Sequence, residues 1–526
     1  MVNIFRIEDN TNISFEDYTK EKYFKDIETY GMQKLWQLII KTNIETPLSE
    51  NSLINYKNFG LLYELGLAYI NKKDKQKVGA YYTPIDVANL LSDFLIDLNG
   101  ENICDVACGT GNLILSVLNN LGKEKAYDLL IKGKVFLYDT DSLALSICRH
   151  TIALIYGKET FDKIHCCSDN FLKETTKLPT NSKVISNPPY FKIDTSSIDF
   201  SLSEIANQSK ELYAAFMEKI IKNSVSSVLI TPYSFLHGNK FSKLRYFLNE
   251  YSGYLFSFDN VPGNIFNGNK IGTLSSSNRN SVRTTISVVN NSGENGFQVS
   301  QLIRFHNSER KKMLSKTFLL SIISEKKQII SVNHPIYCKQ FKTLEKVYEN
   351  WQNQSSGTLR QLTCEDSTYV VYMPHACRYF TCGVTHPLQR SMRDIIYAKD
   401  EKSFYFLYTI LNSSFAYWYG RMFDGGINFS SNLALKMPSF IDKVTDKQFE
   451  EMKELVNFAI LNEKQYIVKK LNAGSYQENV KFPVLYRRDF DSILLKILDL
   501  GIDITNFDKP YSKTILKVSG VEEYAE

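Results

Sequence analysis

The chain has 526 residues, of which 43% are hydrophobic and 23% charged, a composition that predicts a globular protein with roughly two to four domains. It contains no apolar run of about 18 residues and no apolar core at its N-terminus, so we expect neither a membrane span nor a signal peptide, and we predict a cytoplasmic protein. Its nine cysteines lack the spacing of a disulfide framework and fit reduced thiols better.

The net charge is +5, and its distribution is more informative than its size. Seven basic residues and only two acidic ones lie between Arg304 and Lys327. Such a segment could neutralise the phosphates of a nucleic acid, or it could form the solvated face of a surface helix. Both interpretations stay open at this point.

The N-terminal part of the chain is predicted to be helical. Leu62, Leu65 and Tyr69 recur at helical spacing within residues 1–75, and a charged linker spans residues 71–77. Thr83 followed by Pro84 is typical of a helix start, with a hydroxyl at the N-cap and proline at the first helical position. We therefore expect a helix over residues 85–98, whose N-terminus could hold a carboxylate.

Residues 103–187 alternate between strand and helix patterns, and a further helix and three strand patterns follow, which predicts a doubly wound, mostly parallel sheet of the Rossmann-like α/β class. Seven strands are expected, at residues 103–107, 135–138, 163–167, 184–187, 227–231, 254–258 and 284–290. Residues 267–283 are rich in Gly, Ser and Asn and carry Lys270, Arg279 and Arg283, which predicts a mobile basic loop.

The alternation is lost from about residue 330 onward, which predicts a separate α+β domain with two late helices near residues 446–471 and 490–500. We therefore divide the chain into a helical N-terminal segment (residues 1–75), an α/β domain (residues 76–325) and a C-terminal domain (residues 326–526).

Polar residues follow four of the predicted strands in a fixed order. A glycine turn, Gly109-Thr110-Gly111, follows the first strand, Asp139 ends the second, and Asp169 with Phe171 ends the third. The carboxyl ends of parallel strands meet at one edge of a sheet, where ligands bind. Asp139 suits a ribose diol and Asp169 an adenine amine, with Phe171 against the ring.

The glycine turn lacks the third glycine of dinucleotide-binding proteins, and Asp139 lies beyond the usual spacing, so the first crossover is expected to contain an insertion. A nucleoside without pyrophosphate is the better fit. Each acid alone is more often a helix cap or a surface charge, but their joint occurrence in this order favours a ligand site.

The fourth strand ends in Asn187-Pro188-Pro189-Tyr190. Proline cannot donate a ladder hydrogen bond, so the strand stops there and the backbone is stiff. An amide side chain, carbonyl acceptors and an aromatic ring at this edge suit a planar amine that stacks and donates hydrogen bonds.

Taken together, Tyr81-Tyr82-Thr83-Pro84, Asp105 with Cys108-Gly109-Thr110-Gly111, Asp139, Asp169 with Phe171, and Asn187-Pro188-Pro189-Tyr190 resemble the class I methyltransferases that use S-adenosylmethionine. The order of these motifs, with a long C-terminal region last, resembles the γ class of N6-adenine DNA methyltransferases. Residues 211–218 and 411–419 also resemble segments of that family. The resemblance is close over residues 75–320 and loose over residues 330–445.

The resemblance implies roles for individual residues. S-adenosylmethionine would be held by Tyr82, Thr83, Asp105, Gly109, Thr110, Gly111, Asn112, Asp139, Asp169 and Phe171. Asn187 and the Pro188 carbonyl would accept hydrogen bonds from the target amine, and Tyr190 and Phe266 would stack on the target base. Candidate DNA contacts are Arg279, Arg378 and Arg421, and also Arg390 and Arg393.

The implied reaction is direct in-line transfer of a methyl group to adenine N6 of a base flipped out of duplex DNA, without a metal. Expected partners are double-stranded DNA and a separate restriction endonuclease of a bacterial restriction–modification system, although an orphan epigenetic enzyme is also compatible. Methylation of an RNA amine or of a protein glutamine amide, and a non-catalytic DNA-binding module, remain alternatives. The long C-terminal region favours DNA.

A group of cysteines and histidines invites a zinc interpretation, namely Cys364, His375, Cys377, Cys382 and His386. Their spacing forms no paired C-x-x-C hooks, so ordinary core thiols and histidines are favoured and no metal site is predicted.

Overall fold

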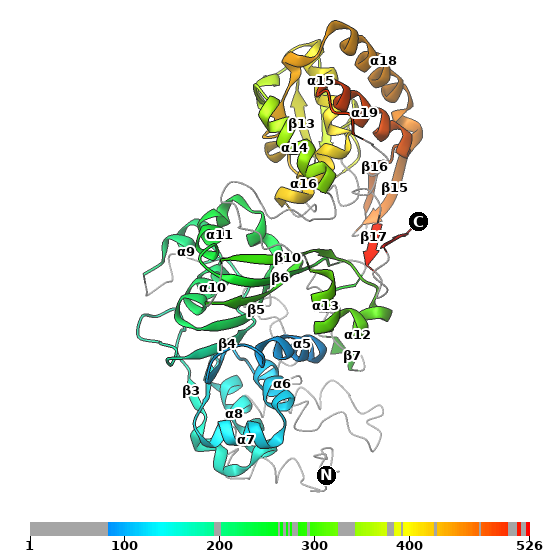
Figure 1. The fold of residues 1–526 in the computed structure, drawn as a ribbon. Coiled ribbons are helices and arrows are strands. Elements are labelled where there is room, and N and C mark those ends of the chain that lie inside the picture. The colour runs from blue at the N-terminus through cyan, green and yellow to red at the C-terminus, as the bar shows by residue number, and fades with distance from the viewer. Residues whose placement is uncertain are drawn as a thin grey trace. The chain divides into compact units, whose positions relative to one another are not determined.

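The computed structural model describes residues 83–502 apart from 194–200, 261–262, 267–269, 272–273, 276–281, 292–294, 324–341, 376–382, 391–392, 425–428 and 473–474, and it also describes residues 513–516 and 522–525. The predicted N-terminal helices and Tyr82 lie outside these residues. The described residues divide into two units (Figure 1). The first contains those up to Ile323 except 236–239, and the second contains those from Lys342 onward.

The first unit is built around an eight-stranded sheet with the order β10-β6-β9-β5-β4-β1-β2-β3. Its strands are β1 (Asn102–Val106), β2 (Val135–Tyr138), β3 (His165–Cys167), β4 (Ser182–Ser186), β5 (Ser226–Pro232), β6 (Ser252–Phe258), β9 (Thr284–Asn290) and β10 (Gly296–Ile303). Within this sheet only β9 runs antiparallel to its neighbours, which confirms the predicted mostly parallel, doubly wound fold. A two-stranded pair, β7 (Lys270–Ile271) and β8 (Leu274–Ser275), lies apart from it.

The predicted number of seven strands is wrong, because β10 adds an eighth strand at the edge beside β6. The register of β10 on β6 shifts between Val299 and Leu302. Such an irregularity interrupts the alternation of buried and exposed side chains that identifies a strand in sequence, which explains why the pattern does not reveal this one.

Helices cover both faces of the sheet, with α9, α10 and α11 on one side and α5 and α6 on the other (Figure 1). The helices of this unit are α5 (Ile85–Leu95), α6 (Asn112–Leu121), α7 (Lys123–Ile131), α8 (Ser142–Tyr156), α9 (Glu204–Ser209), α10 (Leu212–Asn223), α11 (Ser242–Leu248), α12 (Arg310–Met313) and α13 (Lys316–Ile322). The extra helix α7 between β1 and β2 accounts for the long spacing from the glycine turn to Asp139.

The second unit is α+β, as predicted. Its helices are α14 (Lys342–Gln354), α15 (Glu401–Leu411), α16 (Ser414–Asp424), α17 (Ser431–Ala434), α18 (Asp446–Asn462) and α19 (Val484–Ile497). Its two-stranded sheets are β11 (Gly357–Thr358) with β14 (Pro438–Ser439), β12 (Val370–Pro374) with β13 (Arg393–Tyr397), β15 (Ile467–Asn472) with β16 (Ser475–Val480), and β17 (Lys513–Leu516) with β18 (Glu522–Ala525). Among the described helices, none is long and apolar enough to cross a membrane.

The predicted late helix over residues 446–471 is wrong in its second half, because α18 ends at Asn462 and β15 begins at Ile467. The pairing of β15 with β16 decides the conformation of this stretch. Helical periodicity cannot predict it, because periodicity reflects only the local sequence. The second predicted late helix exists but begins earlier, at Val484, directly after Pro483 at its N-cap.

A buried ion triad joins three segments at the carboxyl edge of the large sheet. Asp259 follows β6 and accepts from Arg283, which precedes β9, and from Arg304, which follows β10, with both N···O distances 2.7 Å. All three residues are at most 7% exposed. The expectation that Arg283 belongs to a mobile basic loop is therefore wrong, and Arg304 does not contribute to a basic surface.

We predict that Asp259→Asn lowers the free energy of unfolding by about 3–5 kcal/mol, because two buried guanidinium groups lose their compensating charge. Urea denaturation measures this directly. Asp128→Asn is the matched control, since Asp128 pairs with Lys132 at the surface with both side chains more than half exposed, and such pairs contribute about 0–1 kcal/mol. Equal losses in the two variants would contradict the structural role of the triad.

Candidate functional site

The glycine turn after β1 adopts a backbone that few residues tolerate. Ala107, Gly109 and Gly111 all have positive φ angles, of 60°, 53° and 93°. A Cβ atom added to Gly111 would lie 2.3 Å from Sγ of Cys148, so the close approach of α8 also requires glycine there. Ala107 is an unusual residue for the left-handed region, and such strain is commonly found at functional sites.

Asp139 at the end of β2 holds this turn in place. Its Oδ2 accepts from the backbone N–H of Gly109 at 2.7 Å, and its Oδ1 accepts from that of Asp141 at 2.9 Å. Burial raises the pKa of the Asp139 carboxyl above its ordinary value. Each carboxylate oxygen has a second lone pair, so the group can accept further hydrogen bonds from a ligand.

Asp105 lies beneath the turn and is fully buried. Its Oδ2 accepts from the N–H of Ile114 in α6 at 3.0 Å, whereas its Oδ1 has no hydrogen-bond partner among the described residues. Burial, reinforced by the nearby Asp139 charge, raises the pKa of Asp105 to about 8. Asp105 therefore braces the first turn of α6, and the carboxyl is mostly neutral at neutral pH.

The two residues predicted after β3 lie in different surroundings. Asp169 is exposed and pairs with Lys173 at 3.1 Å, and its bond from the Asn170 N–H, followed by the Lys173 contact, lowers its pKa. Phe171 is only 3% exposed and packs against the rings of Tyr138 and Phe216, at centroid distances of 5.6 and 5.5 Å. The structure thus places Asp169 at the surface and Phe171 in the core.

Thr83 connects three segments of the site. Nδ2 of Asn187 donates to the Thr83 hydroxyl at 2.9 Å, and Nδ2 of Asn112 donates to the Thr83 carbonyl at 3.0 Å. The N-cap of α5 is Pro84, without a side-chain cap, so the prediction that the Thr83 hydroxyl caps the helix is wrong. The hydroxyl instead accepts from the amide at the end of β4.

Tyr190 and Phe266, the two predicted stacking residues, lie next to each other. Their ring centroids are 6.2 Å apart at an interplanar angle of 62°, which is an edge contact. The Tyr190 hydroxyl donates to the Ile230 carbonyl of β5 at 2.7 Å. Pro188 is buried and Asn187 is half-buried beside them.

Arg310 positions the Phe266 loop, a role that the sequence does not reveal. Its guanidinium binds both carboxylate oxygens of Asp86 in α5, at 2.5 and 3.0 Å. It also donates to the carbonyls of Asn264 and Ile265, each at 2.6 Å. Asp86 lies 224 positions away in the chain, so no local pattern could have indicated this contact.

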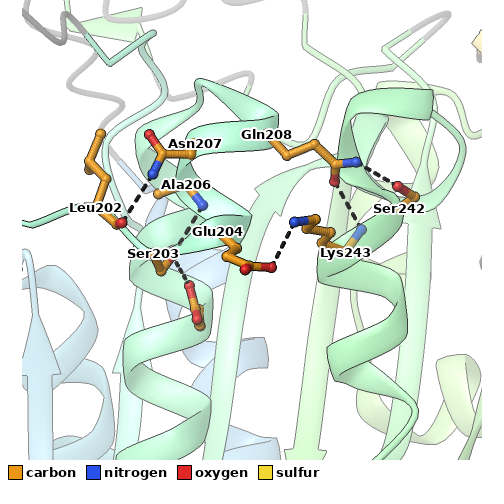
Figure 2. A network of polar contacts seen from close by, with 9 residues as sticks. Leu202, Ser203, Glu204, Ala206, Asn207, Gln208, Ser242 and Lys243 are labelled. Atoms are coloured by element: carbon orange, nitrogen blue, oxygen red, sulfur yellow. Dashed lines mark hydrogen bonds and ion pairs between the residues drawn. The ribbon is translucent and has the colours of Figure 1, made fainter.

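The segment that leaves the Asn187 motif is secured on α10 and α11. Residues 191–193 pair with residues 210–212, and Ser203 caps α9 while donating to Glu218. Gln208 of α9 donates to Ser242 at 2.7 Å and accepts from the Lys243 N–H, and Lys243 pairs with Glu204 (Figure 2). These contacts hold the segment that follows the Asn187 motif against α9, α10 and α11.

The structure describes the side chains of only some of the arginines that were predicted to contact DNA. Arg279 and Arg378 lie outside the described residues, and Arg421 lies in α16 with its side chain not described. Arg390 donates to the Glu478 carbonyl and to Asn479, and Arg393 donates to the Leu388 carbonyl. Both of the latter therefore make structural contacts within the second unit.

Two of the residues weighed for zinc are histidines, and each contacts a carboxylate, His375 with Asp394 at 2.6 Å and His386 with Glu463 at 2.8 Å. Within the part of the chain that the structure describes, no three His, Cys, Asp or Glu side chains are grouped to hold a metal ion. Cys377 and Cys382 lie outside that part.

The site so defined is a polar edge of a doubly wound sheet, where the glycine turn held by Asp139 and the Asn-Pro-Pro-Tyr motif follow parallel strands. The family model described as N-6 DNA Methylase matches residues 55–359, more than half of the chain. The chain therefore belongs to the N-6 DNA Methylase family.

Two of the curated proteins similar to this chain are methylase subunits of type I restriction enzymes. The MpnII type I restriction enzyme methylase subunit of Mycoplasma pneumoniae is 27% identical over 177 residues, which are 31% of this chain and 31% of the relative. The MjaIX methylase subunit of Methanocaldococcus jannaschii is 30% identical over 134 residues, 25% of this chain and 22% of the relative. The matches thus span less than a third of each relative.

Among solved structures, a DrdV–DNA complex is similar at 12% identity with a TM-score of 0.46, over 78% of this chain and 60% of that one. The family assignment comes from the sequence match, and the fold comes from the order of the sheet.

We predict that the buried Asp105 carboxyl makes stability fall with rising pH. The pKa of this carboxyl rises from an ordinary value of 3.8 to about 8 on folding, so the folded state retains a proton that the unfolded state releases. This contribution is complete below about pH 4 and is lost as pH rises to about 8, at up to about 1.4 kcal/mol per pH unit.

Asp105→Asn should therefore flatten the pH dependence of the free energy of unfolding between about pH 5 and pH 8. Asp169→Asn serves as the control, because its carboxyl has a lowered pKa and titrates below this window. An unchanged slope in Asp105→Asn would show that Asp105 is ionised in the folded protein.

We further predict that Arg310→Ala loosens the loop that carries Phe266, because Asn264 and Ile265 lose their anchor to α5. Hydrogen–deuterium exchange of residues 263–266 should increase by roughly tenfold or more, equivalent to about 1.4 kcal/mol of local opening. Lys311→Ala, an exposed change on the same helix, should leave this exchange unaltered. Unchanged exchange in Arg310→Ala would exclude the positioning role.

Proposed function

We propose that the chain is an S-adenosylmethionine-dependent methyltransferase that methylates adenine N6 in duplex DNA. The observation that carries this proposal is the Thr83 junction, which links the amide of Asn187 to Asn112, the residue that follows the glycine turn. A donor site and an acceptor site thus adjoin at one edge of the sheet. Membership of the N-6 DNA Methylase family supports the assignment of the acceptor.

The residues at this edge fit the cofactor. Asp139 would accept from ribose hydroxyls through the lone pairs that Gly109 and Asp141 do not use, and the exposed Asp169 would accept from the adenine amine. Thr83, Asn112 and the turn from Gly109 to Gly111 would surround the methionine portion. Asp105, Thr110 and Phe171 are buried, and we assign them to support of these groups. The bound cofactor supplies a methyl group already activated on a sulfonium.

Asn187 prepares the acceptor. Because its NH₂ end donates to Thr83, the orientation of the amide is set and its Oδ1 is the acceptor end. Together with the Pro188 carbonyl, it would accept both N–H bonds of the target amine and draw them from the plane of the ring. The nitrogen lone pair, otherwise delocalised into the purine, is thereby directed at the methyl group.

The target base must leave the helix to reach this edge. Tyr190 would stack on the flipped base, which offsets about 1–3 kcal/mol of lost stacking. Phe266 is only 4% exposed, and we assign it to support of Tyr190 through their edge contact. We assign residues 76–325 to catalysis and residues 326–526 to recognition of the DNA sequence. Because relatives are named as type I restriction enzyme methylase subunits, we also assign this chain to a restriction–modification system that includes a separate endonuclease.

The proposal is tested by incubating the protein with methyl-labelled S-adenosylmethionine and a mixture of unmethylated DNA, RNA and protein. Label should enter DNA. Label confined to RNA or protein would favour the alternative amine acceptors, and a protein that binds DNA without transferring any label would be a non-catalytic module.

We predict that Asn187→Ala reduces transfer by roughly a hundredfold or more, an amount typical of a lost group that stabilises the transition state, while cofactor affinity stays within about twofold. Single-turnover assays and calorimetric titration separate the two effects. Asp139→Ala is the contrasting variant and should weaken cofactor binding. Normal transfer by Asn187→Ala would disprove the mechanism.

A further inference from the structure

The second unit contains a β-hairpin, formed by β15 and β16, that extends from the end of α18 and returns to α19. Its six residue pairs run in unbroken antiparallel register from Ile467↔Val480 to Asn472↔Ser475. In Figure 1 the hairpin projects beyond α18 and α19. The sequence does not reveal this hairpin, because its periodicity predicts a helix over the first strand.

The base of the hairpin is held firmly. Val480 belongs to the apolar core of the unit, and Ile467 packs against that core. Glu478 exchanges backbone contacts with Gln389, since its N–H donates to the Gln389 carbonyl and its carboxylate accepts from the Gln389 N–H, both at 2.9 Å. Arg390 adds bonds to the same strand. The tip is therefore presented on a rigid support.

The tip exposes an apolar pair. Leu471 and Tyr476 lie directly opposite each other and are 65% and 60% exposed. Alternation along the strands places them on the same face as Ile467 and Val480, whose side chains contribute to the core. On this face the charged Lys469–Glu478 pair separates the anchored pair Ile467–Val480 from the exposed pair Leu471–Tyr476, which no described residue covers.

The net positive charge of the hairpin and its flanking residues favours binding of a polyanion. Residues 463–488 contain six basic residues and two acidic ones, and one of the acids, Glu463, is only 1% exposed and occupied by Thr385, His386 and Tyr408. Lys469, on the same face as the apolar pair, lies 3.4 Å from the Glu478 carboxylate, but its side chain is 62% exposed and remains accessible to a phosphate.

The shape of the feature fits a groove of duplex DNA. A two-stranded ribbon enters the major groove of B-DNA, where apolar side chains contact base edges such as the thymine methyl group.

We propose that the β15–β16 hairpin is a DNA-contacting ribbon, with Leu471 and Tyr476 inserted against the bases and Lys469 on a phosphate. This rests on the proposed function, because it concerns how the second unit engages the DNA that the first unit methylates. Arg390, predicted from the sequence to touch DNA, acts here as an anchor of the ribbon.

The test compares Leu471→Ser/Tyr476→Ser with Leu461→Ser. Leu461 is 83% exposed on α18, so its change removes an equally uncovered apolar side chain away from the tip. The ligand is the duplex DNA that the wild-type protein labels, and binding is measured by fluorescence anisotropy. The double variant should bind at least roughly tenfold more weakly, with the cofactor affinity and thermal midpoint of the wild type, whereas Leu461→Ser should bind normally.

Lys469→Ala should reduce the steepness of the fall of log K with log salt by about one unit. Equal DNA binding by the double variant and the wild type would overturn the inference and leave the proposed function intact. A photoreactive benzoylphenylalanine at position 476 that cross-links to protein and not to DNA would also overturn it. Failure of the wild-type protein to label DNA at all would instead refute the proposed function.

Discussion

The parallel pairing of β1 with both β2 and β4 brings the glycine turn, Asp139 and Asn187 to one edge of the sheet. Parallel strands end at the same edge, so a turn, an acid and an amide that are far apart in the chain become neighbours. Thr83 then joins the parts, because its hydroxyl accepts from Asn187 and its carbonyl accepts from Asn112. The result is one edge of the sheet that carries the residues proposed for the methyl donor and for the acceptor amine.

Carboxylates perform much of this positioning, and most of them bind backbone N–H groups. Asp139 holds the glycine turn and Asp105 holds α6, and in the second unit Asp491 caps α16 through the N–H of Ser414. Asn412 in turn binds both backbone groups of Gly383. Two residues of the segment 411–419, Asn412 and Ser414, therefore make structural contacts within their own unit.

The parts of the fold with local patterns are predictable from the sequence. The strand–helix alternation identifies the sheet, and the polar residues at strand ends identify the edge that carries the site. Prediction fails where distant contacts decide the outcome. Helical periodicity predicts a helix at β15 because it takes no account of the partner strand β16. Gly-rich composition predicts a mobile loop at Arg283, although this residue is buried in an ion pair with Asp259. No residue near Arg310 in the sequence indicates its bond to Asp86. The sequence predicts that the Thr83 hydroxyl caps α5, whereas in the structure this hydroxyl accepts a hydrogen bond from Asn187.

The central claim is that this edge presents hydrogen-bond acceptors to a planar amine and directs its lone pair at a methyl group. The most direct measurement is nucleoside analysis of unmethylated DNA after incubation with the wild-type protein and S-adenosylmethionine. The account predicts N6-methyldeoxyadenosine as the modified nucleoside. Modification at a ring carbon or ring nitrogen would contradict it, because an amide acceptor at Asn187 has no role in activating such atoms.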